Sequence, residues 1–162
     1  MIRPPFLYII VPVFIFIVTC YILSHYYVIQ ISGSLPRGIY KKVPIFGKIS
    51  RGQLVLVTIP VEARQLMINR GWIPGHLTYH LIKPVEAIPG DHVKVDHTGV
   101  YINNRYKGAL RQKDQQGLML PQFRFNGVLH PNTYFLLGQG ANSFDSRYIG
   151  PVHKQLILCF VE

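Results

Sequence analysis

The chain has 162 residues, 49% apolar and 15% charged, so it is long enough for one domain with a core, and wholesale disorder is excluded. Seventeen Lys and Arg against seven Asp and Glu give a net charge of +10, which favours anionic lipid, nucleic acid or acidic protein partners, or simply a well-solvated surface. Two cysteines, Cys20 and Cys159, make no disulfide framework, and no cysteine or histidine spacing indicates a zinc site.

An apolar segment lies near the start of the chain. Phe6–Leu23 is eighteen residues without a charge, which as a helix would be about 27 Å long and nearly match the hydrocarbon core of a bilayer. Membrane helices tolerate an internal proline such as Pro12. A cleavable signal peptide is the alternative, but Ser24–Tyr27 is bulky and aromatic, as at a membrane interface. We therefore expect an uncleaved transmembrane anchor over residues 6–24.

The charges that flank this segment predict its orientation. Arg3 and the N-terminal amine precede it, and the next Lys or Arg on the other side is Arg37. By the positive-inside rule, residues 1–5 are expected in the cytoplasm. Residues 25–162 are then a domain on the far side of the bacterial inner membrane, in the periplasm.

The residues after the anchor alternate between short β-like runs and Gly- or Pro-containing turns. The runs that predict strands are Gln53–Ile59, Tyr79–Ile88, His92–Asp96, Gly99–Asn103, Thr133–Gly138 and Gln155–Val161. Val61–Arg70 has apolar residues at helical spacing before Gly71, which predicts one short helix. Residues 107–131 are polar and interrupted by Gly and Pro, which predicts a long loop or excursion. The predicted fold is mainly β: an antiparallel β-sheet domain with one short helix, preceded by a single N-terminal transmembrane helix.

Three segments carry a pattern that indicates catalysis, namely Ser32–Tyr40, Leu81–Asp91 and Ser143–Pro151. The first places a hydroxyl on a Gly- and Pro-containing turn, and Ser34 is only eleven residues beyond Leu23, so it lies near the membrane surface. The second places a lysine in an apolar strand, where burial lowers its pKa and lets a neutral amine accept a proton. A serine beside such an amine becomes a nucleophile without a histidine. Singly, each residue is more often an ordinary turn serine or a solvated lysine.

These segments resemble the boxes of the signal peptidase I superfamily, which are membrane-anchored Ser/Lys endopeptidases. The resemblance extends from the anchor nearly to the end of the chain. The sequences SLPRGIY from Ser34, RGWIPG from Arg70 and SFDSRY from Ser143 are most similar to the TraF-type conjugative-transfer peptidases. A signal-peptidase-like β-sheet domain is therefore expected.

The resemblance implies roles for six residues. Ser34 matches the nucleophile and Lys83 the general base, while Ser143 matches the hydroxyl that orients the lysine amine. Asp145 and Arg147 match a structural or electrostatic pair near the site. Ser32 matches the side-chain donor that joins the Ser34 backbone N–H in the oxyanion hole.

The same resemblance implies a substrate and partners. The expected substrate is a membrane-held prepilin or pre-protein of conjugative transfer (type IV secretion), with small residues such as alanine before the cleavage site. The sequence is compatible with two outcomes of the reaction, hydrolysis of the substrate or closure of a cyclic pilin by acyl transfer. The lipid bilayer and other proteins of the conjugation apparatus are the expected partners; no cofactor, metal or direct nucleic-acid binding is expected.

Two other functions and two kinds of histidine site are the alternatives to this interpretation. A general type I signal (leader) peptidase is one, and a non-catalytic basic scaffold of pilus or secretion assembly is another. His76 and His80 have a helical ligand spacing, but Gly75 and the absence of a glutamate partner favour ordinary histidines over a metal site or a histidine-based triad. Trp72 is expected to pack rather than to bind substrate.

Overall fold

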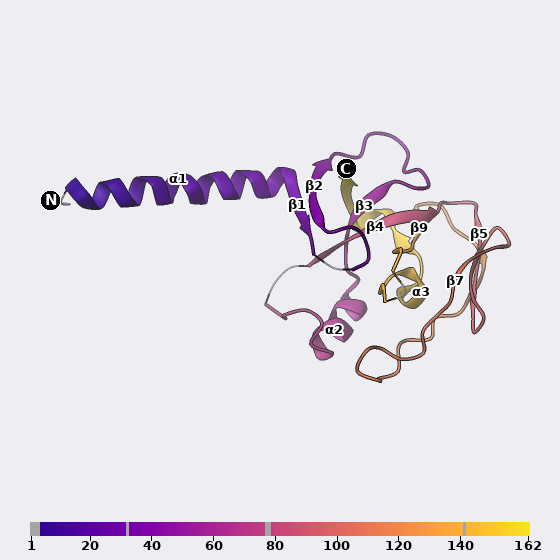
Figure 1. The fold of residues 1–162 in the computed structure, drawn as a ribbon. Helices are drawn as coiled ribbons and strands as arrows, with labels where there is room; N and C mark the ends of the chain where they lie inside the picture. The colour runs from indigo at the N-terminus through magenta and orange to yellow at the C-terminus, as the bar shows by residue number, and fades with distance from the viewer. Residues whose placement is uncertain (1–3, 32, 77–78, 141) are drawn as a thin grey trace.

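The structure is a computed structural model, and it describes residues 4–31, 33–76, 79–140 and 142–162. Its most prominent element is helix α1 (Pro4–Tyr26), which projects from the rest of the molecule as a single rod (Figure 1). Within the described residues, α1 is the one helix that is long and apolar enough to cross a membrane, over Tyr8–Tyr26. It includes the predicted anchor of residues 6–24 and fits a single-pass membrane anchor.

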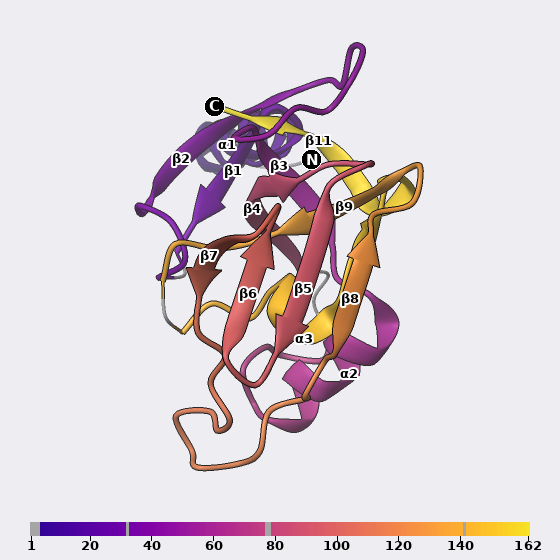
Figure 2. The same cartoon turned by 90° about the vertical axis from the view of Figure 1, so that its right-hand side faces the viewer.

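The remaining chain forms two antiparallel sheets. The seven-stranded sheet has the order β1-β2-β11-β3-β4-β9-β10, and the four-stranded sheet has the order β7-β6-β5-β8, which Figure 2 shows face-on. The strands are β1 (Tyr27–Gln30), β2 (Gly38–Val43), β3 (Leu54–Thr58), β4 (His80–Ala87), β5 (His92–Asp96), β6 (Gly99–Ile102), β7 (Arg105–Gly108), β8 (Phe125–Val128), β9 (Thr133–Leu136), β10 (Val152–His153) and β11 (Ile157–Val161).

The mainly β prediction is confirmed, and each predicted strand is present as β3, β4, β5, β6, β9 or β11. The predicted helix is α2 (Val61–Asn69). The structure adds a four-residue helix, α3 (Ser146–Ile149), and a 3-10 turn over Lys154–Leu156. Both are too short, at four and three residues, to carry a helical periodicity that the sequence could reveal.

The predicted long loop over residues 107–131 is shorter than expected. β7 ends at Gly108, and β8 pairs with β5 from Val95↔Phe125 to His92↔Val128. Asn126 and Gly127 give β8 a weak apolar pattern, so its strand conformation depends on the hydrogen bonds that β5 offers. The excursion that remains, residues 109–124, contains a single β-bridge between Lys113 and Met119.

Strands β4 and β9 join the two halves of the core. Val85 and Leu136 are buried in the cluster of the seven-stranded sheet, and Ala87 and Phe135 are buried in the cluster under the four-stranded sheet. Pairing between β4 and β9 is irregular from Val85 to Ala87, and this bulge turns Ala87 to the same side as Phe135. Strands β4 and β9, both in the seven-stranded sheet, therefore contribute side chains to both core clusters, and this pair of strands carries the candidate site.

Helix α1 passes into the sheet without a linker. β1 begins at the residue after Tyr26 and pairs with β2 from Tyr27↔Lys41 onward. The Lys42 ammonium on β2 donates to the Ser24 carbonyl, 2.7 Å away, at the last turn of α1. A cation at this end of a helix is favoured by the helix dipole, so strand pairing and this hydrogen bond both hold α1 on the sheet.

Candidate active site

Lys83 lies in the middle of β4 and is almost completely buried, with 3% of its surface exposed. On one side β4 pairs with β3, where Lys83 faces Val55; on the other side β9 pairs through Leu136, which faces Val85, and the Leu137 N–H then donates to the Pro84 carbonyl over 3.2 Å. Pro84 keeps Lys83 in an extended conformation and donates no backbone hydrogen bond. The Lys83 ammonium donates to the Ser143 hydroxyl over 2.8 Å.

Gly138 makes this approach of lysine and serine sterically feasible. A Cβ at Gly138 would lie 2.1 Å from Ser143 Oγ and 3.2 Å from Lys83 Nζ, so any side chain there would displace them. The backbone of Gly138 is held at both ends: its N–H donates to Asp145 Oδ2 over 2.8 Å, and its carbonyl accepts from Arg147 Nη2 over 2.6 Å. Gly138 is therefore a fixed wall of the lysine site.

Asp145 and Arg147 form the buried ion pair that holds this wall. Asp145 is 1% exposed and caps α3, where it accepts the backbone N–H of Arg147 at 3.1 Å and its Nε and Nη2 at 3.0 Å each. The Ser146 hydroxyl accepts the N–H of Leu136 over 3.0 Å. These bonds satisfy the buried charges of Asp145 and Arg147, and they hold the segment Ser143–Pro151 against the end of β9.

Burial changes the basicity of Lys83. Desolvation lowers the pKa of Lys83 from 10.5 to about 8; the charge of Asp145 raises this pKa and that of Arg147 lowers it, so the pair partly cancels. With a pKa of about 8, roughly one lysine in ten is neutral at pH 7, against about three in ten thousand for an unperturbed lysine. The site thus supplies a neutral amine near physiological pH.

Ser34 lies in the turn after β1 and is 6% exposed. Its carbonyl accepts the N–H of Gln139, the residue after Gly138, over 3.2 Å. The next residue, Leu35, is buried with Leu56, Ile82 and Val161, so the turn is anchored beside the residue that precedes Lys83.

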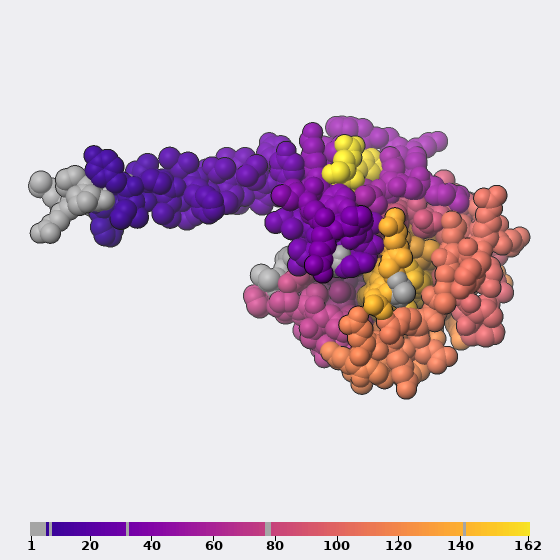
Figure 3. Space-filling view, viewed as in Figure 1, coloured from indigo at the N-terminus to yellow at the C-terminus, as the bar shows by residue number. Residues whose placement is uncertain are grey.

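The three predicted segments therefore meet at residues 138–140 and 142–143, which in Figure 3 lie in yellow-orange between the purple residues that follow β1 and the coral residues of the excursion. The structure brings Lys83, Ser143, Asp145 and Arg147 into direct hydrogen-bonded contact in two pairs, and it brings Ser34 against Gln139. The sixth candidate, Ser32, lies outside the described residues. Sequence reasoning missed Gly138 and Gln139 as parts of the site. Two glycines, Gly138 and Gly140, directly after a buried strand are the signal that indicates a close backbone approach.

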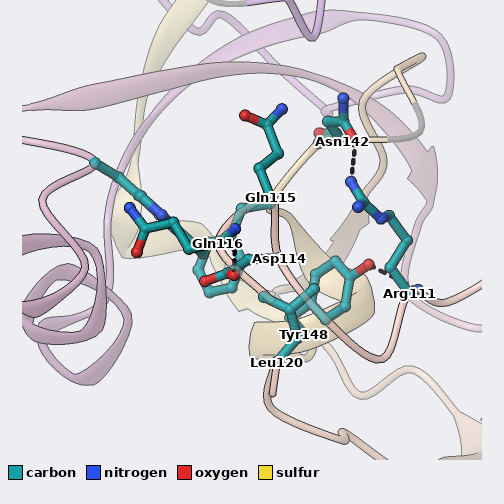
Figure 4. A pocket seen from close by; sticks show the side chains of 10 residues that line it. Arg111, Asp114, Gln115, Gln116, Leu120, Asn142 and Tyr148 are labelled. Atoms are coloured by element: carbon teal, nitrogen blue, oxygen red, sulfur yellow. Dashed lines mark hydrogen bonds between the residues drawn. The ribbon is translucent and has the colours of Figure 1, made fainter. Parts of the chain in front are cut away.

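A cavity of about 250 Å³ opens beside Ser143, between α2, the excursion and α3 (Figure 4). Its lining consists of Trp72, Arg111, Asp114, Gln115, Gln116, Leu120, Asn142, Ser143, Phe144 and Tyr148. Trp72 packs on the core cluster of α2 and contacts the Phe144 ring edge-on, at 5.3 Å between centroids. Trp72 therefore packs, as predicted, and also forms part of the cavity wall.

The histidines singled out in the sequence do not share a helix. His76 lies in a turn and His80 begins β4, so their spacing of four residues has no ligand geometry behind it. Within the described parts of the chain, the structure contains no group of three His, Cys, Asp or Glu side chains close enough to hold a metal ion.

Comparison with known proteins places this geometry in a family context. A family model described as signal peptidase, peptidase S26, matches residues 3–161. The conjugal transfer protein TraF of Agrobacterium tumefaciens (strain 15955) is 32% identical over 150 residues, covering 86% of this chain and 82% of that protein. A probable conjugal transfer protein TraF of Sinorhizobium fredii is 34% identical over 143 residues, covering 82% and 73%. A signal peptidase I structure from Enterococcus faecalis V583 aligns with a TM-score of 0.43 and 16% identity, covering 73% of this chain and all of that chain.

Proposed function

The chain belongs to the signal peptidase family, peptidase S26, and from that membership we propose a membrane-anchored serine endopeptidase with Ser34 as nucleophile and Lys83 as general base. One observation carries the proposal: a buried lysine with a pKa of about 8 donates to Ser143, and the Ser34 backbone is bonded to the residue after the glycine that walls this lysine. A Ser/Lys mechanism requires a neutral amine within reach of the nucleophilic serine, and these contacts bring the Ser34 turn to the wall of the lysine site.

The proposed reaction is acyl transfer. The Lys83 amine takes the Ser34 hydroxyl proton while Ser34 Oγ bonds to the substrate carbonyl carbon, and the carbonyl oxygen becomes an oxyanion. The Ser34 N–H, with Ser32, is proposed to donate hydrogen bonds to this oxyanion. The Lys83 ammonium then gives its proton to the leaving amine as the C–N bond breaks. Water, deprotonated by Lys83, releases the acyl group; an amine of the same substrate chain would instead close a ring.

Asp145, Arg147 and Ser143 are proposed as positioning residues. Ser143 accepts from the Lys83 ammonium and fixes the direction of the amine, while the Asp145–Arg147 pair holds Gly138 against both. Because the pair is buried and mutually neutralised, it fixes geometry with little net effect on the charge of the lysine.

The proposed substrate is a prepilin or pre-protein held in the inner membrane, processed for conjugative transfer. Two observations support it: the relatives named above are conjugal transfer proteins, and α1 joins the domain close to Ser34 without a linker. The N-terminus is proposed to lie in the cytoplasm and the catalytic domain in the periplasm, following the charges around α1.

Co-expression of the full-length protein with a prepilin of its conjugation system tests the proposal. Intact-mass spectrometry should find trimmed pilin with the wild type and unaltered precursor with Ser34→Ala or Lys83→Ala. Lys48→Ala and Ser50→Ala, at exposed positions, are the matched controls and should process normally. A product one water lighter than the trimmed linear peptide indicates ring closure.

Three outcomes would overturn parts of this assignment. Processing that survives Ser34→Ala contradicts the nucleophile. Conjugation that proceeds normally with both Ser34→Ala and Lys83→Ala indicates a scaffold rather than an enzyme. Rescue of a strain depleted of its own leader peptidase indicates a general signal peptidase in place of a dedicated one.

A further inference from the structure

Arg111 lies where two cavities meet beside the candidate site. One is the 250 Å³ cavity next to Ser143, and the other is a cavity of about 400 Å³ on the far side of Gly138. Arg111 lines both cavities, at the base of the excursion that follows β7. The first cavity is lined by Ser143, whose hydroxyl accepts from the Lys83 ammonium, so a substrate chain in this cavity would lie beside the Arg111 guanidinium.

Among the residues that the structure describes, no carboxylate pairs with Arg111, whereas the neighbouring charged side chains are paired. Arg147 is paired with Asp145 at 3.0 Å, and Lys107 is paired with Glu86 at 3.0 Å. The remaining carboxylate of the lining, Asp114, is bonded to Arg70. For the described residues that line the two cavities, Arg111 supplies the excess positive charge. A cation in such a concave, partly desolvated site attracts an anion more strongly than it would in open water.

Arg111 is also held in position. Its backbone N–H donates to the Tyr148 hydroxyl over 3.1 Å, and its Nη1 donates to the amide oxygen of Asn142, as the dashed line in Figure 4 marks. The side chain is half-buried, and a guanidinium has five N–H donors in a planar fork. The Arg111 guanidinium is therefore held in place and has further N–H donors beyond the one bonded to Asn142. Its planar geometry suits a carboxylate bound through two parallel hydrogen bonds.

The distance to the reactive centre sets the substrate position that Arg111 can reach. Its partner Asn142 immediately precedes Ser143, whose hydroxyl contacts the Lys83 amine. Two hydrogen bonds and one Cα–Cα step of about 3.8 Å therefore connect the guanidinium to the amine, a path of about 10 Å with the side chains included. An extended peptide advances about 3.3 Å per residue, so Arg111 would meet a residue about two to four positions from the scissile bond.

We propose that Arg111 is a specificity-determining residue that binds a carboxylate of the substrate about two to four residues from the scissile bond. The inference rests on the proposed peptidase function and deepens it. The carboxylate has two sources: an aspartate or glutamate side chain, or the terminal carboxylate of a short released peptide. Both present the same two acceptor oxygens to the guanidinium.

The test uses the full-length protein in detergent micelles and a library of fluorescence-quenched peptides with an alanine before the central bond. Positions two to four on each side carry Asp, Glu, Asn, Gln or Lys, and each peptide is made with a C-terminal acid and with a C-terminal amide. The wild type should prefer Asp or Glu over its amide counterpart by about 10- to 100-fold in kcat/KM at one position. A preference confined to the C-terminal acid identifies the terminal carboxylate as the source.

Three variants test whether the preference for a carboxylate depends on the charge of Arg111: one removes this charge, one reverses it, and one is a control at another position. Arg111→Gln should abolish the preference for the carboxylate, and Arg111→Glu should transfer it to lysine-containing peptides. Arg105→Gln removes the same charge from an exposed position on β7 and should keep the wild-type preference. A wild type that cleaves the library without preferring acids, or an Arg111→Gln variant that keeps the preference, overturns this inference alone. A wild type that cleaves no peptide and also leaves the co-expressed prepilin unaltered overturns the proposed function.

Discussion

Replacing Gly138 with alanine should separate Lys83 from Ser143 without changing any charge. The new methyl group would lie 2.1 Å from Ser143 Oγ, about 1.3 Å closer than an ordinary contact of 3.4 Å. Gly138 does not have a positive φ, so alanine fits its backbone conformation and the clash with the side chains is the whole perturbation. Ser143 must therefore rotate or move by more than 1 Å.

Such a displacement removes the 2.8 Å hydrogen bond that orients the amine. Misplacing a catalytic group by about 1 Å costs on the order of 10²-fold in rate, and overpacking a core position costs about 1–3 kcal/mol of stability. We expect a fall of roughly 100-fold in kcat/KM and a lower Tm, with the protein still folded. Quenched-peptide kinetics and thermal unfolding of the full-length protein in detergent measure the two effects.

Two further variants make the result interpretable. Gly127→Ala on β8 places its Cβ 3.7 Å from the Phe125 ring, which is an ordinary contact, so rate and Tm should stay near the wild type. Gly138→Ala combined with Ser143→Gly removes both atoms that clash most severely, so Tm should recover while the rate stays low. A Gly138→Ala variant with the wild-type rate would refute the idea that this glycine positions the lysine.

Other consequences of the buried lysine and its ion pair are measurable. The kcat/KM of the wild type should rise with pH to a plateau, with an apparent pKa of about 8, because the neutral amine is the reactive form; a pH-independent rate between pH 6 and 9 would contradict it. Lys83→Met should be inactive yet about 1–3 kcal/mol more stable than the wild type at pH 7. The folded protein holds the lysine pKa at about 8, below its unfolded value of 10.5, so the wild type loses stability as the pH falls from about 10.5 to about 8 and keeps the full penalty below pH 8. Urea unfolding at pH 7 and at pH 10.5 should therefore show a smaller advantage of Lys83→Met at the higher pH. Asp145→Asn should cost about 3–5 kcal/mol, because Arg147 stays buried without its counter-charge, and an unchanged urea midpoint would show that the pair is not structural.

The strands predicted from the sequence are those whose own residues carry a pattern. β3, with the sequence LVLVT, is apolar and β-branched, and it lies between two other strands of the large sheet. β2 and β7, with the sequences GIYKKV and RYKG, are mostly exposed and contain lysine or arginine, so their composition resembles that of a loop. Their strand conformation comes from hydrogen bonds to distant neighbours, which a local pattern does not contain.

In the candidate site, too, some residues could be predicted from a local sequence pattern and others depend on contacts between distant parts of the chain. Lys83 could be singled out because a lone lysine in an apolar strand is unusual, and the structure places it in the core. The role of Gly138 depends on three residues meeting in space, and the pairing of Arg70 with Asp114 joins residues 44 positions apart. Such contacts follow from the way the sheets pack, so the sequence contains the glycine signal for a close approach at Gly138 but not the partners in either contact.

The direct passage of α1 into β1 fixes how far the domain, and Ser34 within it, lies from the end of the helix. Because no flexible tether separates the helix from the sheet, and Lys42 ties the last helical turn to β2, the height of Ser34 above the end of α1 is fixed by strand pairing. With α1 in a bilayer, the proposed nucleophile Ser34 would stay at a constant distance from the lipid surface. Such an enzyme would select its cleavage site by how far along its length a substrate emerges from the membrane, as well as by the residues that flank the bond.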